Sequence, residues 1–568
     1  MPFKNSSCNF ALIIWLGGLS LINSQCSDRH QATLAIINAT CWTGNAQQPL
    51  AEAIAIKGNR FVAVGTKAQI EKWITPQTVL INAQGGFITP GFFDAHLHFL
   101  EGGSRLTEVQ LRDARTPEEF IQRIKTYAAN CPPGKWITGG DWDHSLWGGQ
   151  LPERSWIDSV TPHNPVWINR LDGHMALANS LALQLAGIDK HTPDVPGGTI
   201  VRDAAGDPTG ILKDNAMFMV EKVIPPSDDS ARLAALEAAM DYVASQGVTS
   251  VQHMGSWEDL KIFIQAYELK KLKTRISAAV PLATYQELAK RKSDYRRYEP
   301  WLKVTSVKGF VDGSLGSHTA AFLANYTDTP TDSGLLVNTA DELYELISGA
   351  DKAGLQVCMH AIGDRANRIL LDIYARVIQE NGPRDRRFRI EHAQHLDPQD
   401  IPRFAQLGVI ASMQPYHCID DGRWAEKFIG YERCRTTYAF RSLLAAGAHL
   451  AFGSDWYVAP PSPLWGIYAA VTRRTLDNKN PAGWIPEQKI SVAEALQAYT
   501  LGAAYASFDE KIKGSLEVGK LADLVILNQN LLTIDPTQIP EVKVLMTICD
   551  GKIIYDKITR SSDNLAIR

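Results

Sequence analysis

The sequence lacks several features that would assign it quickly to a class of protein. Its eight cysteines are scattered and none forms a CxxC pair, so neither a zinc ribbon nor a thioredoxin-like site is indicated. The net charge is only -4, without a basic stripe or an acidic tail, which argues against a nucleic-acid-binding protein. No internal repeat or low-complexity segment is visible. What remains is a chain whose apolar content of 45% can supply a large core.

Long hydrophobic runs are also missing, with one exception near the N-terminus. Lys4 precedes an apolar run over residues 10–22, and the polar residues Asn23 and Gln25 follow it. This order is typical of a secretory signal peptide, and the run is shorter than the roughly 20 residues that span a bilayer. We therefore predict that residues 1–25 are a signal peptide or an uncleaved N-terminal anchor. The protein would then be secreted, periplasmic or located in the lumen of the secretory pathway.

At 568 residues the chain is long for one compact domain, and its two ends have a similar character. Candidate strands and hairpins lie near both ends, at residues 32–43, 53–65, 514–527 and 542–554. Such short strands at both ends indicate one small β domain assembled from both termini. We predict a β-sandwich made of residues 30–88 and 507–560, with the rest of the chain inserted into it.

Between these ends, apolar strand-like runs alternate with amphipathic helical stretches, which favours a parallel α/β architecture. The first two runs, residues 87–96 and 247–253, are too far apart for one crossover. We therefore expect an insertion at about residues 105–215, and an insertion after a barrel strand lies over the active-site face. The later runs are residues 304–310, 355–360, 388–391, 409–413 and 450–453. Together they predict an α/β chain with a TIM-like (β/α)8 barrel over residues 89–506.

The strongest chemical signal is a pair of histidines at the end of the first run. His96 and His98 are two residues apart, and residues two apart on a strand point the same way. Both imidazoles can therefore reach one metal ion. The triplet alone is a weak signal, but an apolar strand precedes it and a Gly-Gly pair follows it.

Four more polar residues end later strand-like runs: Lys308, His360, His392 and Asp455. Each has an ordinary structural explanation when it is taken singly. A strand-end histidine can be hydrogen-bonded, a lysine can extend to the rim or pair with Asp312, and an aspartate after Gly-Ser can cap a helix. Those explanations would have to hold at five strand ends in order along the chain. We therefore interpret these four residues and the histidine pair as one site.

This order of residues resembles the binuclear amidohydrolases, in which HxH, Lys, His, His and Asp lie on barrel strands one, four, five, six and eight. The chain is similar in particular to the amidohydrolase-3 group, which includes YtcJ-like proteins and N-substituted formamide deformylase. The matching segments are residues 89–98, 170–180, 311–321, 360–366, 389–394 and 452–456. Two positions depart from the group: His318 stands where many relatives have arginine, and His253 stands where an acid is common.

The resemblance implies a site for two divalent metal ions. The histidine pair and Asp455 then hold one ion. His360 and His392 hold the other, with Lys308 between the two ions. Imidazole and carboxylate ligands suit zinc or a similar divalent ion. An ammonium group has no lone pair, so Lys308 can bridge metals only after its amine reacts with carbon dioxide to form a carbamate. Asp455 is the expected catalytic base, which accepts the proton of a metal-activated hydroxide.

Three residues are weaker candidates for substrate binding. His174 lies in the predicted insertion and can reach the substrate from there, although a structural role fits it equally well. Trp142 and Trp456 are candidate walls of the pocket, although core packing is the commoner role of a tryptophan.

These observations predict a hydrolase that acts on a carbon–nitrogen bond other than a peptide bond, in an amide or an N-formyl compound. A mononuclear ring deaminase is the first alternative, and the presence of Lys308 favours the binuclear enzyme over it. A non-catalytic binding protein on the same fold is the second alternative, and the complete set of ligand positions argues against it. The expected partner is a small-molecule substrate, not nucleic acid, and a homodimer stays open. The sequence identifies neither the substrate nor the physiological metal.

Overall fold

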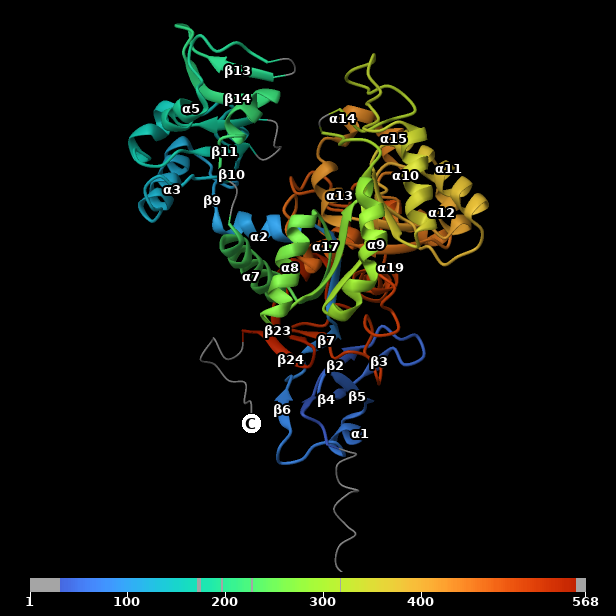
Figure 1. Cartoon of the computed structure of the whole chain (residues 1–568). Coiled ribbons are helices and arrows are strands. Elements are labelled where there is room, and N and C mark those ends of the chain that lie inside the picture. The colour runs from blue at the N-terminus through green and yellow to red at the C-terminus, as the bar shows by residue number, and fades with distance from the viewer. Residues whose placement is uncertain (1–30, 171–174, 196–197, 226–227, 317, 558–568) are drawn as a thin grey trace, which may run out of the picture.

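A computed structural model describes residues 31–557 of the chain, apart from residues 171–174, 196–197, 226–227 and 317. The predicted signal segment and the candidate residue His174 therefore lie outside the described residues. Within the described part of the chain, no helix is both long and apolar enough to cross a membrane. Figure 1 shows a barrel with a small β domain below it and a further α/β unit beside its upper end.

The central sheet has eight strands that pair in parallel and in chain order, which confirms the predicted TIM-like (β/α)8 barrel. Both faces of these strands are buried, as is usual for a parallel sheet that helices cover. Sequence patterns do not predict the third strand, β16. The strands are β8 (Phe92–Leu97), β15 (Val248–Met254), β16 (Arg275–Pro281), β17 (Leu302–Phe310), β18 (Gln356–Ala361), β19 (Arg389–His392), β20 (Ile410–Met413) and β21 (His449–Phe452).

Helices between the strands form the outer layer of the barrel (Figure 1). Several begin at side-chain caps that the sequence provides. Thr339 and Ser256 each accept a hydrogen bond from the backbone three residues later, where an acidic side chain reaches back to the cap residue. The longer helices of this layer are α7 (Asp229–Ser245), α8 (Trp257–Glu268), α9 (Tyr285–Tyr295), α10 (Ala340–Lys352), α11 (Asp364–Asn381) and α17 (Pro463–Thr472).

The barrel closes between β21 and β8 through the segment that follows β21. The Asp455 N–H donates to the His96 carbonyl oxygen at 2.7 Å, and the His98 N–H donates to the Trp456 carbonyl oxygen at 2.6 Å. The Ser454 N–H donates to the Asp94 carboxylate at 2.9 Å. No regular ladder joins these two strands within the described residues. The seam of the barrel is therefore made by the residues that carry the predicted site.

Strands from both ends of the chain form two sheets below the barrel. An apolar cluster with side chains from both sheets, including Ile36, Ile54, Ile88, Ile526 and Ile548, lies between them, so the two sheets form a sandwich. One sheet contains β1 (Leu34–Ile37), β4 (Ala53–Lys57), β5 (Arg60–Gly65) and β6 (Val79–Asn82). The other contains β2 (Thr40–Trp42), β3 (Leu50–Ala51), β7 (Phe87–Pro90), β22 (Leu524–Leu527), β23 (Val544–Cys549) and β24 (Lys552–Asp556).

The run at residues 87–96, which we expect to be a single barrel strand, is divided between two sheets. β7 pairs with β22 in the sandwich, and β8 begins the barrel after Gly91. Pro90 has no N–H to continue a ladder. A Cβ atom on Gly91 would lie 2.3 Å from Thr249 Oγ1, so only glycine fits at the bend. The chain therefore passes directly from the sandwich into the strand that carries the histidine pair.

The insertion after the first barrel strand is a folded unit with its own sheet and two apolar clusters. It follows α2 (Phe99–Thr107) and lies beside the barrel end that is remote from the sandwich (Figure 1). Its strands are β9 (Val109–Gln110), β10 (Gly139–Trp142), β11 (Trp167–Arg170), β12 (Met175–Ala178), β13 (Gly198–Arg202) and β14 (Pro208–Asp214). Its helices include α3 (Pro117–Ala129) and α5 (Ser180–Ala186).

Candidate metal centre

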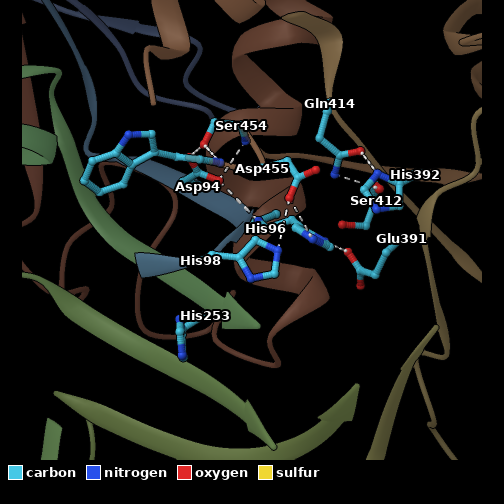
Figure 2. A network of polar contacts seen from close by, with 12 residues as sticks. Asp94, His96, His98, His253, Glu391, His392, Ser412, Gln414, Ser454 and Asp455 are labelled. Atoms are coloured by element: carbon cyan, nitrogen blue, oxygen red, sulfur yellow. Dashed lines mark hydrogen bonds and ion pairs between the residues drawn. The ribbon is translucent and has the colours of Figure 1, made fainter. Parts of the chain in front are cut away.

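The two histidines of the first barrel strand converge on one carboxylate (Figure 2). His96 Nε2 and His98 Nε2 each lie 3.4 Å from Asp455 Oδ1. These separations are longer than good hydrogen bonds, but they match the edge of a tetrahedron. Metal–ligand bonds of about 2.0–2.1 Å place tetrahedral ligands about 3.3–3.4 Å apart. His96 Nε2 is also buried and makes no hydrogen bond within the described residues. The donor types and their spacing therefore fit a divalent ion.

Asp455 is held in place by the turn that follows β21. Its backbone adopts a positive φ of 58°, and Asp94 braces the preceding residue through hydrogen bonds to the backbone N–H and the hydroxyl of Ser454. Burial opposes the charged form of the Asp455 carboxyl. The imidazoles of His96 and His98 outweigh that effect and hold its pKa well below the usual range. Asp455 therefore presents an anion to the site.

The orientations of three site histidines, His96, His360 and His392, are each fixed by a hydrogen bond on the opposite side of the ring. His96 Nδ1 donates to Glu391 Oε2 at 2.6 Å, and His360 Nε2 donates to the Gly313 carbonyl oxygen at 2.9 Å. His392 Nδ1 lies 2.8 Å from Gln414 Oε1, and the Gln414 amide nitrogen donates to the Ser412 carbonyl oxygen. In each case the proton sits away from the centre, so the other ring nitrogen keeps its lone pair. Such outer partners are a usual feature of metal-binding histidines.

A buried ion pair lies behind His96. Glu391 Oε1 is 2.8 Å from Arg389 Nε, and both side chains are fully buried. Burial opposes ionisation of Glu391, but Arg389 and His96 outweigh it and lower the pKa of Glu391 to about 2. Arg389 also donates to the Ala95 carbonyl oxygen, which ties this pair to β8. Glu391 is thus a permanent anion that accepts the His96 proton.

Lys308 lies buried in the same region, on β17. Burial lowers the pKa of its amine, while the nearby carboxylates of Glu391 and Asp455 oppose that effect. Its Nζ atom lies 4.7 Å from the ring centre of Phe310, and it makes no ion pair within the described residues. Asp312, the alternative partner, instead accepts hydrogen bonds from the backbone N–H groups of residues 321, 362 and 363. The amine is therefore not neutralised by Asp312.

The predicted metal ligands of later strands lie close to the first set. The ring centres of His360 and His392 are 4.6 Å apart, and those of His96 and His392 are 5.0 Å apart.

The two tryptophans predicted to bind substrate lie in different surroundings. Trp456 lines a cavity at the site and packs on Gly102. Trp142 is fully buried in the insertion, with its indole N–H donated to the Ile168 carbonyl oxygen, and it does not line that cavity.

Sequence reasoning missed two residues that the structure adds to the site. Gln414 and His417 follow β20 and enter α13 (Pro415–Asp421). Gln414 contacts His392, and His417 has a ring nitrogen within 4.8 Å of donor atoms of His392 and Asp455. The available signal was a polar residue at the end of the seventh strand, as at the other strands. His253, by contrast, accepts the Phe99 N–H at 3.0 Å and lies 3.3 Å from Asp259, so it supports the start of α2.

A cavity of about 420 Å³ lies between the barrel and the insertion beside this cluster. The barrel side contributes Tyr416, Trp456 and Tyr457, and the insertion contributes Arg112 and Asp141. The Tyr457 ring lies 6.0 Å from the His98 ring, centre to centre, so one wall of the cavity adjoins the candidate metal centre. The cavity has the size and the mixed aromatic and charged lining of a small-molecule site.

Comparison with known proteins gives a consistent result. The model of the Amidohydrolase family matches residues 79–555. "Protein LONG AFTER FAR-RED 3" of Arabidopsis thaliana is 42% identical, with 92% of each chain covered. "Putative amidohydrolase YtcJ" of Bacillus subtilis is 30% identical (89% of this chain, 96% of that one), and N-substituted formamide deformylase of Arthrobacter pascens is 28% identical (92% and 98%). A solved metal-dependent hydrolase of Pyrococcus furiosus, which is uncharacterized, superposes with a TM-score of 0.72 at 30% identity, over 88% of this chain and all of that one.

Proposed function

The chain belongs to the amidohydrolase family, and on that premise we propose that it hydrolyses a non-peptide carbon–nitrogen bond in an amide or N-formyl compound. One observation carries the proposal. His96 and His98 stand at equal distances from the anionic Asp455 oxygen, at the spacing of ligands around one ion. The name of the relative N-substituted formamide deformylase supports the choice of bond.

Divalent ions held here would lower the pKa of a bound water towards neutrality and polarise the substrate carbonyl. We assign His96, His98 and Asp455 to one ion and His360 and His392 to the second, with zinc as the metal that best suits these ligands. Lys308 lies between the two sets and would bridge the ions if its amine is carbamylated. Its burial among apolar strand residues favours the neutral amine that reacts with carbon dioxide, and two nearby cations stabilise the anionic product.

Asp455 performs the proton transfer in this proposal. Its carboxylate accepts the proton of the attacking water and returns it to the leaving nitrogen as the carbon–nitrogen bond breaks. The low pKa of Asp455 in the free protein makes it a weak base, so it can accept the proton only when it lies close to the attacking oxygen. Its position beside both histidines provides that closeness. The aromatic wall of Tyr416, Trp456 and Tyr457 holds the organic part of the substrate.

The proposal is tested with the metal-loaded protein and a panel of N-formyl compounds, N-acyl compounds, cyclic amides, esters and aminated rings. Release of formate or a carboxylate together with an amine supports the proposal, and a metal content of about two ions per chain supports the binuclear site. Ammonia release from a ring with about one ion per chain would replace it by the mononuclear deaminase. A protein that binds metal but hydrolyses no member of the panel would favour a non-catalytic role.

A further inference from the structure

His417 occupies a position in the site that the family pattern does not assign. It lies in the first turn of α13, directly after the seventh barrel strand. One of its ring nitrogens, one His392 nitrogen and one Asp455 oxygen all lie within 4.8 Å of one another. The His392 and His417 rings are nearly parallel, at 11°, with their centres 6.5 Å apart. His417 therefore faces the same space as two of the proposed ligands.

One nitrogen of the His417 ring is unpartnered among the residues that the structure describes. Its Nε2 atom is buried and makes no hydrogen bond with the described residues. Its neighbour Gln414 directs an amide oxygen to His392 instead, and the His417 backbone N–H donates to the Gln414 carbonyl oxygen. A buried, unsatisfied imidazole nitrogen costs free energy, so a native structure usually gives it a partner. An ion at the centre of the site would supply such a partner.

We propose that His417 is a ligand of the second divalent ion, together with His392 and Asp455. The proposal rests on the proposed metal-dependent function but concerns this chain's own ligand set. A carboxylate has two oxygens, so Asp455 can serve the first ion beside His96 and the second beside His417. His417 adds a neutral imidazole, which is a common ligand of zinc. The second ion would then be held by His417 in addition to His360 and His392, with Lys308 beside them.

The test measures metal affinity rather than turnover. Apo protein is titrated with zinc in competition with a chromogenic chelator, and with cobalt(II) while the visible spectrum is recorded. The variants are His417→Gln and His417→Glu. The two new side chains have the same shape, but a glutamate can bind a metal and a glutamine amide binds it poorly. His449→Gln is the control, because His449 is exposed at the opposite end of β21. Thermal unfolding of the apo proteins checks that each variant is folded.

We expect wild type and His449→Gln to bind two ions. His417→Gln should lower the affinity for the second ion by at least about tenfold and leave the affinity for the first within about threefold of wild type. His417→Glu should restore much of that loss and alter the cobalt(II) spectrum. If His417→Gln binds both ions as wild type does, the proposal is overturned, and a selective loss of kcat in that case would make His417 a substrate hydrogen-bond donor. A wild-type protein that binds one ion would overturn it as well. A lack of hydrolysis in the substrate panel would refute the proposed function without altering these affinities.

Discussion

Replacing Glu391 with glutamine removes a charge without changing the shape of the side chain, and two separate effects should follow. Glu391 accepts the His96 proton at 2.6 Å and neutralises Arg389 at 2.8 Å. A glutamine amide can present its NH2 group to His96 Nδ1, and the His96 proton would then move to Nε2. Nε2 is the nitrogen that faces Asp455, so the first ion would lose a ligand lone pair.

The first effect acts on metal affinity. Loss of an outer partner of a metal-binding histidine typically lowers the affinity for the metal by 10–100-fold, which is about 1.4–2.7 kcal/mol. The second effect acts on the free energy of unfolding of the apo protein. Arg389 would remain buried beside an uncharged partner, and breaking a buried pair in this way costs about 3–5 kcal/mol. We therefore expect Glu391→Gln to lower both metal affinity and stability.

The assay separates the two effects with a matched control. Arg275 and Asp523 form another buried pair, at 2.8 Å, which contacts the β-sandwich end of the barrel through Asp550. Asp523→Asn should also destabilise the apo protein in urea, by a smaller amount because Arg275 keeps its ion pair with Asp550, and should leave zinc affinity unchanged. Glu391→Gln should lower both the stability of the apo protein and its zinc affinity. If folded Glu391→Gln held zinc within about twofold of wild type, Glu391 would not set the orientation of the His96 proton.

Three further predictions concern the catalytic base, the lysine and a buried acid. Asp455→Asn should keep the fold and much of the metal but lose kcat by about 10²–10⁴-fold, so near-normal kcat in the purified variant would contradict its role as base. Lys308→Ala should lose activity and regain part of it when a short carboxylic acid in the buffer fills the vacated space; an unmodified Lys308 beside two bound ions, seen without acid exposure, would rule out the carbamate. Burial raises the pKa of Asp421 to about 7, although hydrogen bonds from Tyr438 and Gln394 oppose the rise. Because this folded pKa lies above the unfolded value, wild type should lose stability as the pH rises from about 4 to 7, by at most about 4 kcal/mol. Asp421→Asn should make that loss smaller, as urea unfolding at pH 5 and pH 8 would measure, while the part due to Asp94, whose pKa burial also raises to about 7, should remain. An unchanged pH dependence would contradict the argument.

The barrel was largely predictable because each strand that carries a site residue is a short apolar run with a polar residue at its end. β16 is the exception, because it begins with Arg275 and has the small residues Ser277, Ala278 and Ala279 at its centre. Its register in the barrel comes from its neighbours rather than from its own hydrophobicity. The division at Gly91 was also hidden, since a continuous apolar run does not reveal that its two halves join different sheets.

The site was predictable to a similar extent. The structure brings the histidine pair, Asp455 and His392 together as expected from the strand ends, while metal binding by them stays a prediction. His417 was missed because it lies in a helical turn after its strand, where spacing by two does not apply. Trp142 was a candidate wall by residue type alone, and residue type does not distinguish a cavity from the apolar core of the insertion.

The pairing of β7 with β22 has a consequence for synthesis of the protein. β7 ends at Pro90 and β22 begins at Leu524, so more than 430 residues must be made before the two can meet. At about 5–20 residues per second, a ribosome needs roughly 20–90 s for that length. During this interval the first strands expose apolar side chains such as Ile88 without their partner sheet. A nascent chain stalled before residue 524 should therefore bind chaperones through its N-terminal strands, and release should follow once β22 and β23 have been made.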